Sequence, residues 1–403
     1  MFTLKYPELM PAVKDLVGGL ISFNDADSDL PILVIKVPKE YILSARINQF
    51  IKLYLLPIHI EGQRTFGLVT AFFDDDDEPL VVKTPLFKDP FVIGLLDLLS
   101  NEDIEVYFFD ELSREMLVYR AKVSIPAQAK MKLDDMFLLA PSLSTIKKMI
   151  DQIDMSFVCR SSVDDEQAIR IHLSESVYGE DIFIQDVRPK HHSYHGARGH
   201  SYTMLERKEP GIYQEEDIIQ CLLLAFSPEQ IYLSPKRVHD NEEMCDILVL
   251  TDKNILIIQA KDSPNIDRIS TQKLDRKRKN VLSALKKAIN QVKGAIGYYR
   301  RDNSTLEFLI DDKRHSIDTE SLRVRSMVVV KELFDDQYAE YSTSIFDIYR
   351  SKEVPCILLD YPTFYRFCMN CPSEDDFFNT YDSVMDRAIE HGQYPKLRFG
   401  LVE

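Results

Sequence analysis

The chain has 403 residues, of which 45% are hydrophobic and 28% charged, as in an ordinary globular protein of two or three domains. Its net charge of −16 argues against nucleic-acid binding if the charge is evenly spread. The start, MFTLKYPELM, lacks the basic and apolar regions of a signal peptide, and no apolar run approaches the length of a transmembrane helix. Because its six cysteines are scattered and fit reduced thiols, we expect a cytoplasmic protein that does not enter a membrane.

Residues 1–150 predict a separate N-terminal α+β domain. An Asp-Pro start signal and apolar residues at helical spacing predict a helix at 89–101. Such a domain could be a sensor or an oligomerisation module, through which the chain binds a partner or ligand. Segments rich in β-branched and aromatic residues predict strands at 30–37, 66–73, 104–111 and 116–123.

The polar stretches that follow are expected to be loops. The acidic run Asp74–Glu78 lies between two strands and ends at Pro79, so it predicts a solvated turn. It lacks the alternating acids and the Gly of a calcium loop. Residues 151–205 are expected to be a connector with some strand content, and the four histidines in RPKHHSYHGARGH predict a flexible loop in it.

Residues 206–403 predict a second, mixed α/β domain. Apolar residues at helical spacing mark one helix at 212–226 and a long helix from Val281 to about Arg301. The order of elements is therefore αβββαβ, followed by a further strand and trailing helices. Its strands are expected at 231–238, 245–251, 255–261, 323–333 and 354–361.

Three polar residues stand within two very apolar strands of this domain. Asp246 begins one strand, and Gln259 and Lys261 end the next one, after the polar turn TDKN. Gln259 and Lys261 are two residues apart, so their side chains point to the same face of the strand. A hairpin with its turn at TDKN would bring both side chains next to Asp246 at one end of the sheet.

This combination suits metal-assisted hydrolysis of a phosphodiester. Mg²⁺ (or Mn²⁺) prefers oxygen ligands, which the Asp246 carboxylate, the Gln259 side-chain oxygen and the Ala260 carbonyl could supply. A bound metal lowers the pKa of its water and neutralises charge on the phosphate. Lys261 could orient or deprotonate that water, or stabilise the transition state. The structural alternative is that Asp246 caps a strand and Lys261 extends from a sheet edge.

The pattern Asp246-x12-Gln259-Ala-Lys261, after a helix that carries a Glu, resembles the PD-(D/E)xK restriction-endonuclease-like nuclease superfamily. Its glutamine is similar to that of the Mrr-like branch and of the nuclease-related (NERD) domains. The resemblance covers about residues 205–403. It implies a restriction-endonuclease-like core, metal binding through Asp246 and Gln259, and a catalytic Lys261. The overall layout resembles bacterial antiphage defence nucleases such as Shedu, which implies a Mg-dependent DNA endonuclease of defence or DNA processing.

In this family the first helix often supplies a further Glu, and the chain offers Glu215 and Glu216. Glu215 shares a helix face with Ile218 and Leu222, so we expect it to point inward. Glu216 aligns with Gln220 on the more polar face. We therefore predict that Glu215 belongs to the catalytic set.

The basic residues are concentrated next to the candidate lysine. Between Arg268 and Arg301 there are eleven Lys or Arg residues and one acid, Asp275, which is a local excess of ten positive charges. Such a segment could hold a phosphate backbone without regard to sequence and would be weakened by salt. DNA is the expected partner, with RNA as an alternative. The residues predicted to contact nucleic acid are Lys273, Arg276, Lys277, Arg278, Lys279, Lys286 and Lys293.

Gln259 is neutral where a second acid is more usual, and one charge fewer should weaken metal binding. Two other functions therefore stay open. The chain could be a catalytically inactive nuclease-fold protein that binds nucleic acid or a partner protein. It could also be a structural protein whose nuclease-like half serves assembly, and in each case we expect a homo-oligomer.

Overall fold

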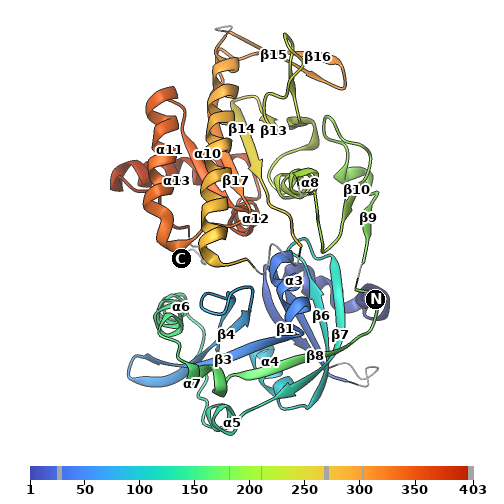
Figure 1. The fold of residues 1–403 in the computed structure, drawn as a ribbon, viewed down its shortest axis with the longest axis vertical. Coiled ribbons are helices and arrows are strands. Elements are labelled where there is room, and N and C mark those ends of the chain that lie inside the picture. Colours follow the sequence, from blue (N-terminus) through green and yellow to red (C-terminus); the bar gives the residue numbers. More distant parts are fainter. Residues whose placement is uncertain (25–29, 181, 210, 267–271, 302–303, 398–403) are drawn as a thin grey trace.

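The computed structural model describes residues 1–24, 30–180, 182–209, 211–266, 272–301 and 304–397. Within them the chain forms two lobes, each built on a sheet of its own (Figure 1). The mixed α/β class predicted from the sequence is confirmed. In the part of the chain that is described, no helix is long and apolar enough to span a bilayer.

The N-terminal lobe is built on one eight-stranded sheet. Its strands are β1 (Gly19–Phe23), β2 (Ile32–Lys36), β3 (Phe50–Ile60), β4 (Gln63–Phe72), β5 (Leu80–Pro85), β6 (Asp103–Phe109), β7 (Glu115–Ser124) and β8 (Ile169–Ser176). Their order across the sheet is β1-β2-β6-β7-β8-β3-β4-β5. The two edge strands, β1 and β5, approach each other, so the sheet curves strongly.

Short helices surround this sheet. They are α1 (Phe2–Lys5), η1 (Pro7–Leu9), α2 (Met10–Asp15), α3 (Lys39–Asn48), α4 (Pro90–Leu99), α5 (Ala127–Asp134), α6 (Leu143–Val158) and α7 (Ser162–Gln167). Helix α4 begins after Asp89, whose side chain accepts a hydrogen bond from the Phe91 N–H at 2.8 Å, with Pro90 in the first turn. Helix α6 crosses residue 150, and β8 pairs with β3 and β7. The N-terminal sheet therefore extends to Ser176, into the segment expected to be a connector.

The remaining connector is partly ordered by a small two-stranded sheet. It contains β9 (Ile184–Asp186), η2 (Pro189–His191) and β10 (Ser201–Thr203). The expected flexible loop of histidines is in fact held by contacts, because His191 Nδ1 lies 2.8 Å from Asp186 Oδ2 and the His192 side chain is buried.

The C-terminal lobe is built on a five-stranded sheet. In order across it, the strands are β11 (Ile231–Leu233), β13 (Ile247–Leu250), β14 (Asn254–Lys261), β17 (Arg323–Val330) and β18 (Cys356–Asp360). The first three are antiparallel and the last three parallel. The central strands are buried almost throughout, which explains their continuous apolar runs. A small sheet of β12 (Lys236–Arg237), β15 (Thr305–Ile310) and β16 (Lys313–Asp318) extends this lobe.

The helices of this lobe are α8 (Gly211–Leu222), η3 (Pro228–Gln230), α10 (Leu274–Tyr299), η4 (Asp335–Gln337), α11 (Tyr338–Lys352), α12 (Tyr361–Asn370) and α13 (Glu374–His391). Helix α10 packs on β14 and β17, while α8 packs on β14 and contacts α12. Because α10 connects β14 to the parallel β17, it runs back along the sheet, and its first turn lies at the end where β14 finishes (Figure 1).

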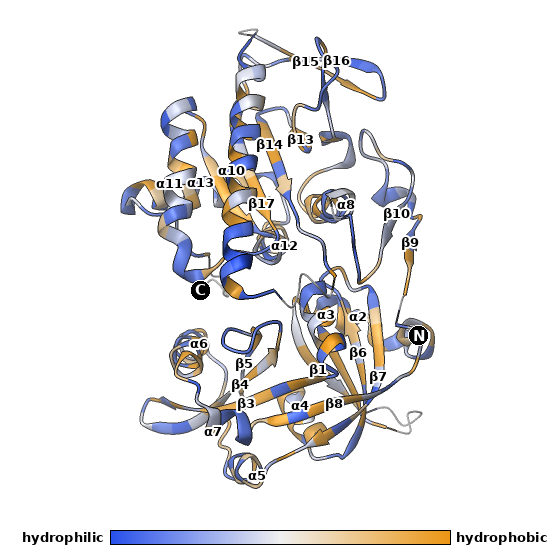
Figure 2. Cartoon of the chain, in the orientation of Figure 1, coloured by the Kyte–Doolittle hydropathy of each residue, from blue (hydrophilic) through white to orange (hydrophobic). Residues whose placement is uncertain are grey.

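Helix α10 begins at Leu274 rather than at Val281, so the basic run 276–279 is helical. The sequence could not reveal this start, because the first turns contain almost no apolar residues (Figure 2). The buried position that continues the apolar stripe toward the N-terminus is occupied by a lysine, Lys277.

Candidate active site

The hairpin of β13 and β14 places Asp246 next to the end of β14. Ile247 lies opposite Ile258, which is the last paired position of the hairpin. Asp246, just before Ile247, therefore lies next to Gln259, just after Ile258. The Asp246 Oδ2 atom accepts a hydrogen bond from the Ala260 N–H at 2.6 Å and lies 3.6 Å from Lys261 Nζ. A carboxylate and an ammonium from neighbouring strands therefore meet at one end of the sheet.

The backbone of Asp246 is held by a hydrogen bond, and its side chain is buried. Its carbonyl accepts a hydrogen bond from the Ser234 N–H at 2.8 Å, which holds the start of β13 against the end of β11. Burial raises the pKa of Asp246 to about 6, although Lys261 and the Ala260 N–H favour the charged form. A second positive charge nearby would further stabilise the ionised form of this carboxylate.

Gln259 carries a buried acceptor that lacks a partner. Its side chain is 1% exposed, and its Oε1 atom accepts no hydrogen bond from any of the described residues. An unsatisfied buried group of this kind typically costs about 1–3 kcal/mol. Because side chains alternate along a strand, Gln259 and Lys261 lie on the same face of β14. The structure thus holds a free oxygen on the face from which Lys261 extends.

The Ala260 backbone adds a third oxygen to this region. Its N–H points toward Asp246, and the N–H and C=O of one strand residue lie on the same edge of the strand. The Ala260 carbonyl therefore lies on the Asp246 side of β14, beyond the end of β13.

Glu215 on α8 is electrostatically coupled to the same group of residues. Burial and, to a smaller extent, the negative charges of Asp246 and Glu243 raise its pKa to about 8, against the opposing effect of Lys261. In the absence of a metal the Glu215 carboxyl is therefore mostly protonated at neutral pH. Such a group can donate a hydrogen bond when protonated and bind a cation when ionised.

Glu216 is more buried than its polar helix face suggested, with 8% of its surface exposed. The reason is that β10 packs against α8, and the Tyr202 backbone forms a hydrogen bond with this carboxyl. Burial, together with the neighbouring Asp217, raises the pKa of Glu216 to about 7. Asp246 is not among the largest influences on this pKa, which distinguishes Glu216 from Glu215.

Glu243 is an acid near the site that the sequence did not single out. It lies three residues before Asp246, and its charge raises the pKa of both Asp246 and Glu215. Its position depends on the loop before β13, which is held by a β-bridge between Lys236 and Glu243. The one available signal was its nearness to Asp246 in the chain.

The donor set fits a hard divalent cation. Among the described residues no three His, Cys, Asp or Glu side chains are grouped to hold a metal ion. The set at the end of β14 is of another kind, because it combines the Asp246 carboxylate with amide and backbone oxygens, and Glu215 is coupled to Asp246 through its charge. The unpartnered Gln259 Oε1 and the raised pKa values of both acids indicate that a cation would satisfy groups that the protein leaves unsatisfied. Oxygen ligands completed by water suit Mg²⁺ or Mn²⁺.

The cations predicted to contact nucleic acid fall into two groups. Lys273, Arg276, Lys279 and Lys286 are exposed. The last three are spaced by three and seven residues, so they lie along one face of α10. This face is opposite the buried stripe that packs on the sheet. Their arrangement forms a basic stripe, and the exposed Asp275 lies on the same face one helical turn before Lys279.

Lys277, Arg278 and Lys293, which were also predicted to contact nucleic acid, form ion pairs within the protein. Lys277 Nζ lies 2.5 Å from Asp74 Oδ2, and Lys293 pairs with Asp347. Arg278 lies 3.2 Å from Glu78 and 3.0 Å from Asp336. The acidic run 74–78 forms a turn between β4 and β5, but its two ends bind α10 instead of being only solvated.

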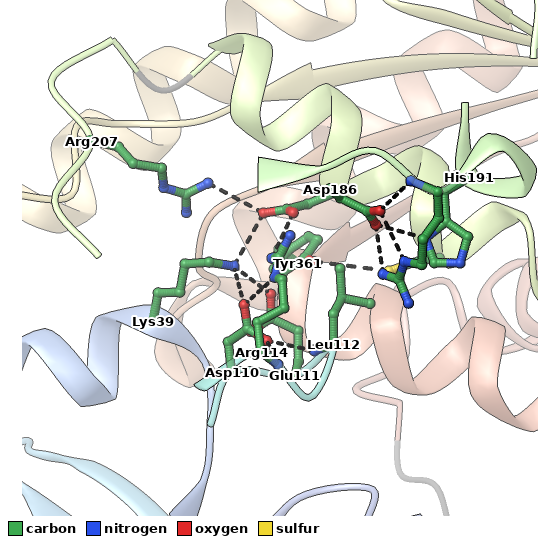
Figure 3. Close-up of polar contacts among 12 residues, drawn as sticks. Lys39, Asp110, Glu111, Leu112, Arg114, Asp186, His191, Arg207 and Tyr361 are labelled. Carbon is green, nitrogen blue, oxygen red and sulfur yellow. Dashed lines mark hydrogen bonds and ion pairs between the residues drawn. The ribbon is translucent and has the colours of Figure 1, made fainter. Parts of the chain in front are cut away.

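A network of buried charges joins the lobes beside the candidate site. Asp217 on α8 lies 2.8 Å from Arg114, 3.2 Å from Lys39 and 3.3 Å from Arg207. Burial alone would raise the pKa of Asp217, but these three cations outweigh it and hold the pKa well below its usual range. Figure 3 shows Lys39, Arg114 and Asp110 close together, with Arg207 reaching in from the other side. No local pattern in the sequence indicates this network.

Comparisons of the chain with protein-family models, with curated proteins and with solved structures find no match. A function is therefore inferred from the residues of the chain and their geometry.

Proposed function

We propose that the chain is a metal-dependent nuclease that hydrolyses DNA phosphodiester bonds. The observation that carries the proposal is the buried, unpartnered Gln259 Oε1 on the strand whose last residues contact Asp246. The element order α8, β11, β13, β14, α10, β17 supports a restriction-endonuclease-like core, because it is the αβββαβ order that the resemblance implies. A role in antiphage defence or DNA processing belongs to the same proposal.

Each residue has a distinct role in this proposal. Asp246, Gln259 and the Ala260 carbonyl would hold Mg²⁺ or Mn²⁺, and Glu215 would add a carboxylate after losing its proton. The bound ion would supply a Lewis acid and a water of lowered pKa. Lys261 would orient or deprotonate the attacking water and stabilise negative charge on the phosphate.

The basic stripe of α10 supports nucleic acid as the substrate. The exposed residues Arg276, Lys279 and Lys286 form one face of a helix whose first turn lies at the same end of the sheet as Lys261. Cations on such a face bind phosphates without regard to sequence. The overall negative charge of the chain does not prevent this, because the stripe is a local feature.

The test is to incubate the protein with supercoiled, linear and single-stranded DNA and with RNA, in Mg²⁺, in Mn²⁺ and in EDTA. We expect metal-dependent cleavage of DNA. Replacing Lys261 with Ala should reduce the rate by about 10²- to 10⁴-fold, the usual contribution of a positioned proton-transfer group, and leave binding intact. Lys253→Ala is the matched control, because Lys253 is an exposed lysine at the opposite end of the same strand pair.

Failure to cut any of these substrates in either metal would refute the nuclease proposal. Equal rates for Lys261→Ala and Lys253→Ala would refute the role assigned to Lys261 even if the protein cuts DNA.

A nucleic-acid-binding protein on an inactive nuclease fold is the second candidate. The observation that favours it is that Gln259 is neutral, so the site has one carboxylate fewer than usual. In that case the protein would bind DNA equally well in Mg²⁺ and in EDTA without cutting it, and binding would still depend on Lys279 and Lys286.

A further inference from the structure

The acidic turn between β4 and β5 binds two cations in the first turns of α10. Lys277 Nζ lies 2.5 Å from Asp74 Oδ2 and also contacts the Asp74 carbonyl at 3.4 Å. At the other end of the turn, Glu78 lies 3.2 Å from Arg278. The turn belongs to the N-terminal lobe and α10 to the C-terminal lobe, so the contact bridges the two.

This contact lies at the same end of the sheet as the candidate active site. The end of β17 is marked by Val330, which pairs with Lys261 at the end of β14. Two residues later, burial raises the pKa of Glu332 to about 7, and the charges of Lys277 and Asp74 both act on it. The Lys277–Asp74 pair therefore lies just beyond the strand end that carries Lys261.

The two segments nearly match in charge. Residues 273–279 contain five Lys or Arg residues and one acid, and residues 74–78 consist of five acids. Asp76 and Asp77 are exposed, and their carboxylates form no ion pair with the described residues of α10, so they present further negative charge beside the helix. A nucleic-acid backbone that approached Lys277 and Arg278 would meet these carboxylates and be repelled.

We propose that the turn 74–78 competes with a nucleic-acid backbone for Lys277 and Arg278, and so shields the end of α10 next to the candidate active site. The choice of a nucleic acid as the competing partner rests on the proposed nuclease function. The contact is exchangeable in part, because the Glu78 side chain is 58% exposed, Arg278 also pairs with Asp336, and exposed ion pairs are weak. A polyanion offers many phosphates and benefits from the release of counterions, so it can displace the turn.

The test compares two double variants of the same turn. Asp74→Asn with Glu78→Gln removes both carboxylates that bind α10, whereas Asp76→Asn with Asp77→Asn removes the same charge from positions that do not. Binding of a short fluorescein-labelled DNA duplex is measured by anisotropy over a range of salt concentrations, in EDTA so that no cleavage occurs. We expect the first variant to bind about tenfold tighter than the second. We also expect its dependence on log salt to steepen by about 0.9, for one phosphate that the released Lys277 neutralises, because Arg278 keeps its ion pair with Asp336.

A third variant assigns the tighter binding to the shared cations. Adding Lys277→Gln and Arg278→Gln to the Asp74→Asn, Glu78→Gln variant should remove the extra affinity, while circular dichroism confirms that each protein is folded. Equal affinities for the two double variants would mean a simple effect of net charge and would overturn the proposal. Absence of DNA binding in every variant would also overturn it. The nuclease proposal is tested separately, by measuring DNA cleavage in Mg²⁺ or Mn²⁺.

Discussion

Asp246 and Glu215 show how burial prepares a pair of acids for a cation. Their pKa values are raised to about 6 and about 8, above the ordinary values near 4. Without metal, the folded protein holds a proton at Glu215 that the unfolded chain releases, so these groups reduce stability as the pH rises from ~4.5 to ~8. A divalent cation favours the ionised forms and reverses this penalty.

Metal affinity should therefore rise with pH and metal binding should release protons. Between pH 6 and pH 8 we expect Mn²⁺ binding to strengthen by up to about tenfold per pH unit for each proton released. Titration calorimetry in two buffers of different ionisation enthalpy counts the protons. Glu215→Gln should remove most of this release, whereas Glu216→Gln should not, because Asp246 is among the main influences on the pKa of Glu215 and not on that of Glu216. Equal proton release by the two variants would exclude Glu215 from the site.

Gln259 should lower the stability of the fold slightly while it serves the candidate site as a ligand. Gln259→Leu replaces the unpartnered amide with an apolar side chain of similar size, so in EDTA we expect stability to be unchanged or higher by about 1 kcal/mol. Metal binding should be lost at the same time. Urea unfolding followed by circular dichroism gives the first quantity and calorimetry the second. A loss of stability above about 2 kcal/mol would mean that Gln259 has a structural role instead.

At the scale of elements, the hairpin of β13 and β14 could be predicted because its information is local. The continuous apolar runs, the polar turn and the spacing of Asp246 from Lys261 all lie within one short segment. The start of α10 could not, because Lys277 takes a buried position that sequence patterns assign to apolar residues. The burial of that lysine depends on Asp74, two hundred residues earlier in the chain, which no local pattern reveals.

The exposed stripe of α10 should carry nucleic-acid binding. Replacing Lys279 and Lys286 with Gln removes two phosphate-binding cations, and we expect the slope of log affinity against log salt to fall by about 1.8, or about 0.9 for each cation. Affinity at low salt should fall by about tenfold or more. The matched control replaces Lys130 and Lys147, exposed lysines on helices α5 and α6 of the N-terminal lobe. Equal losses for both pairs would show that net charge, and not the stripe, governs binding.

At the scale of the whole molecule, buried charge pairs connect the two lobes. Lys39 and Asp217 are separated by 178 residues, and Arg114 and Asp217 by 103. The fold class of each half and the convergence of Asp246 with Lys261 could be inferred from the sequence, but these pairings could not, because each becomes visible only after both lobes are folded and docked. Asp217 lies two residues after Glu215 on α8, so the network also attaches the N-terminal lobe to the candidate site.

Removing Asp217 should therefore test how strongly the lobes are coupled. In Asp217→Asn the cations Lys39, Arg114 and Arg207 lose a shared carboxylate in a buried setting, and we expect a loss of about 3–5 kcal/mol. Glu61→Gln is the control, because it breaks the exposed pair with Lys148 and should change stability by less than about 0.5 kcal/mol. The chain has no Trp, so urea unfolding is followed by far-ultraviolet circular dichroism. Because the network joins two lobes, the variant should also unfold over a broader range of urea concentration. The reason is that α8 and the N-terminal lobe separate before either lobe unfolds. A single sharp transition with the stability of the control would show that the lobes are held together by other contacts.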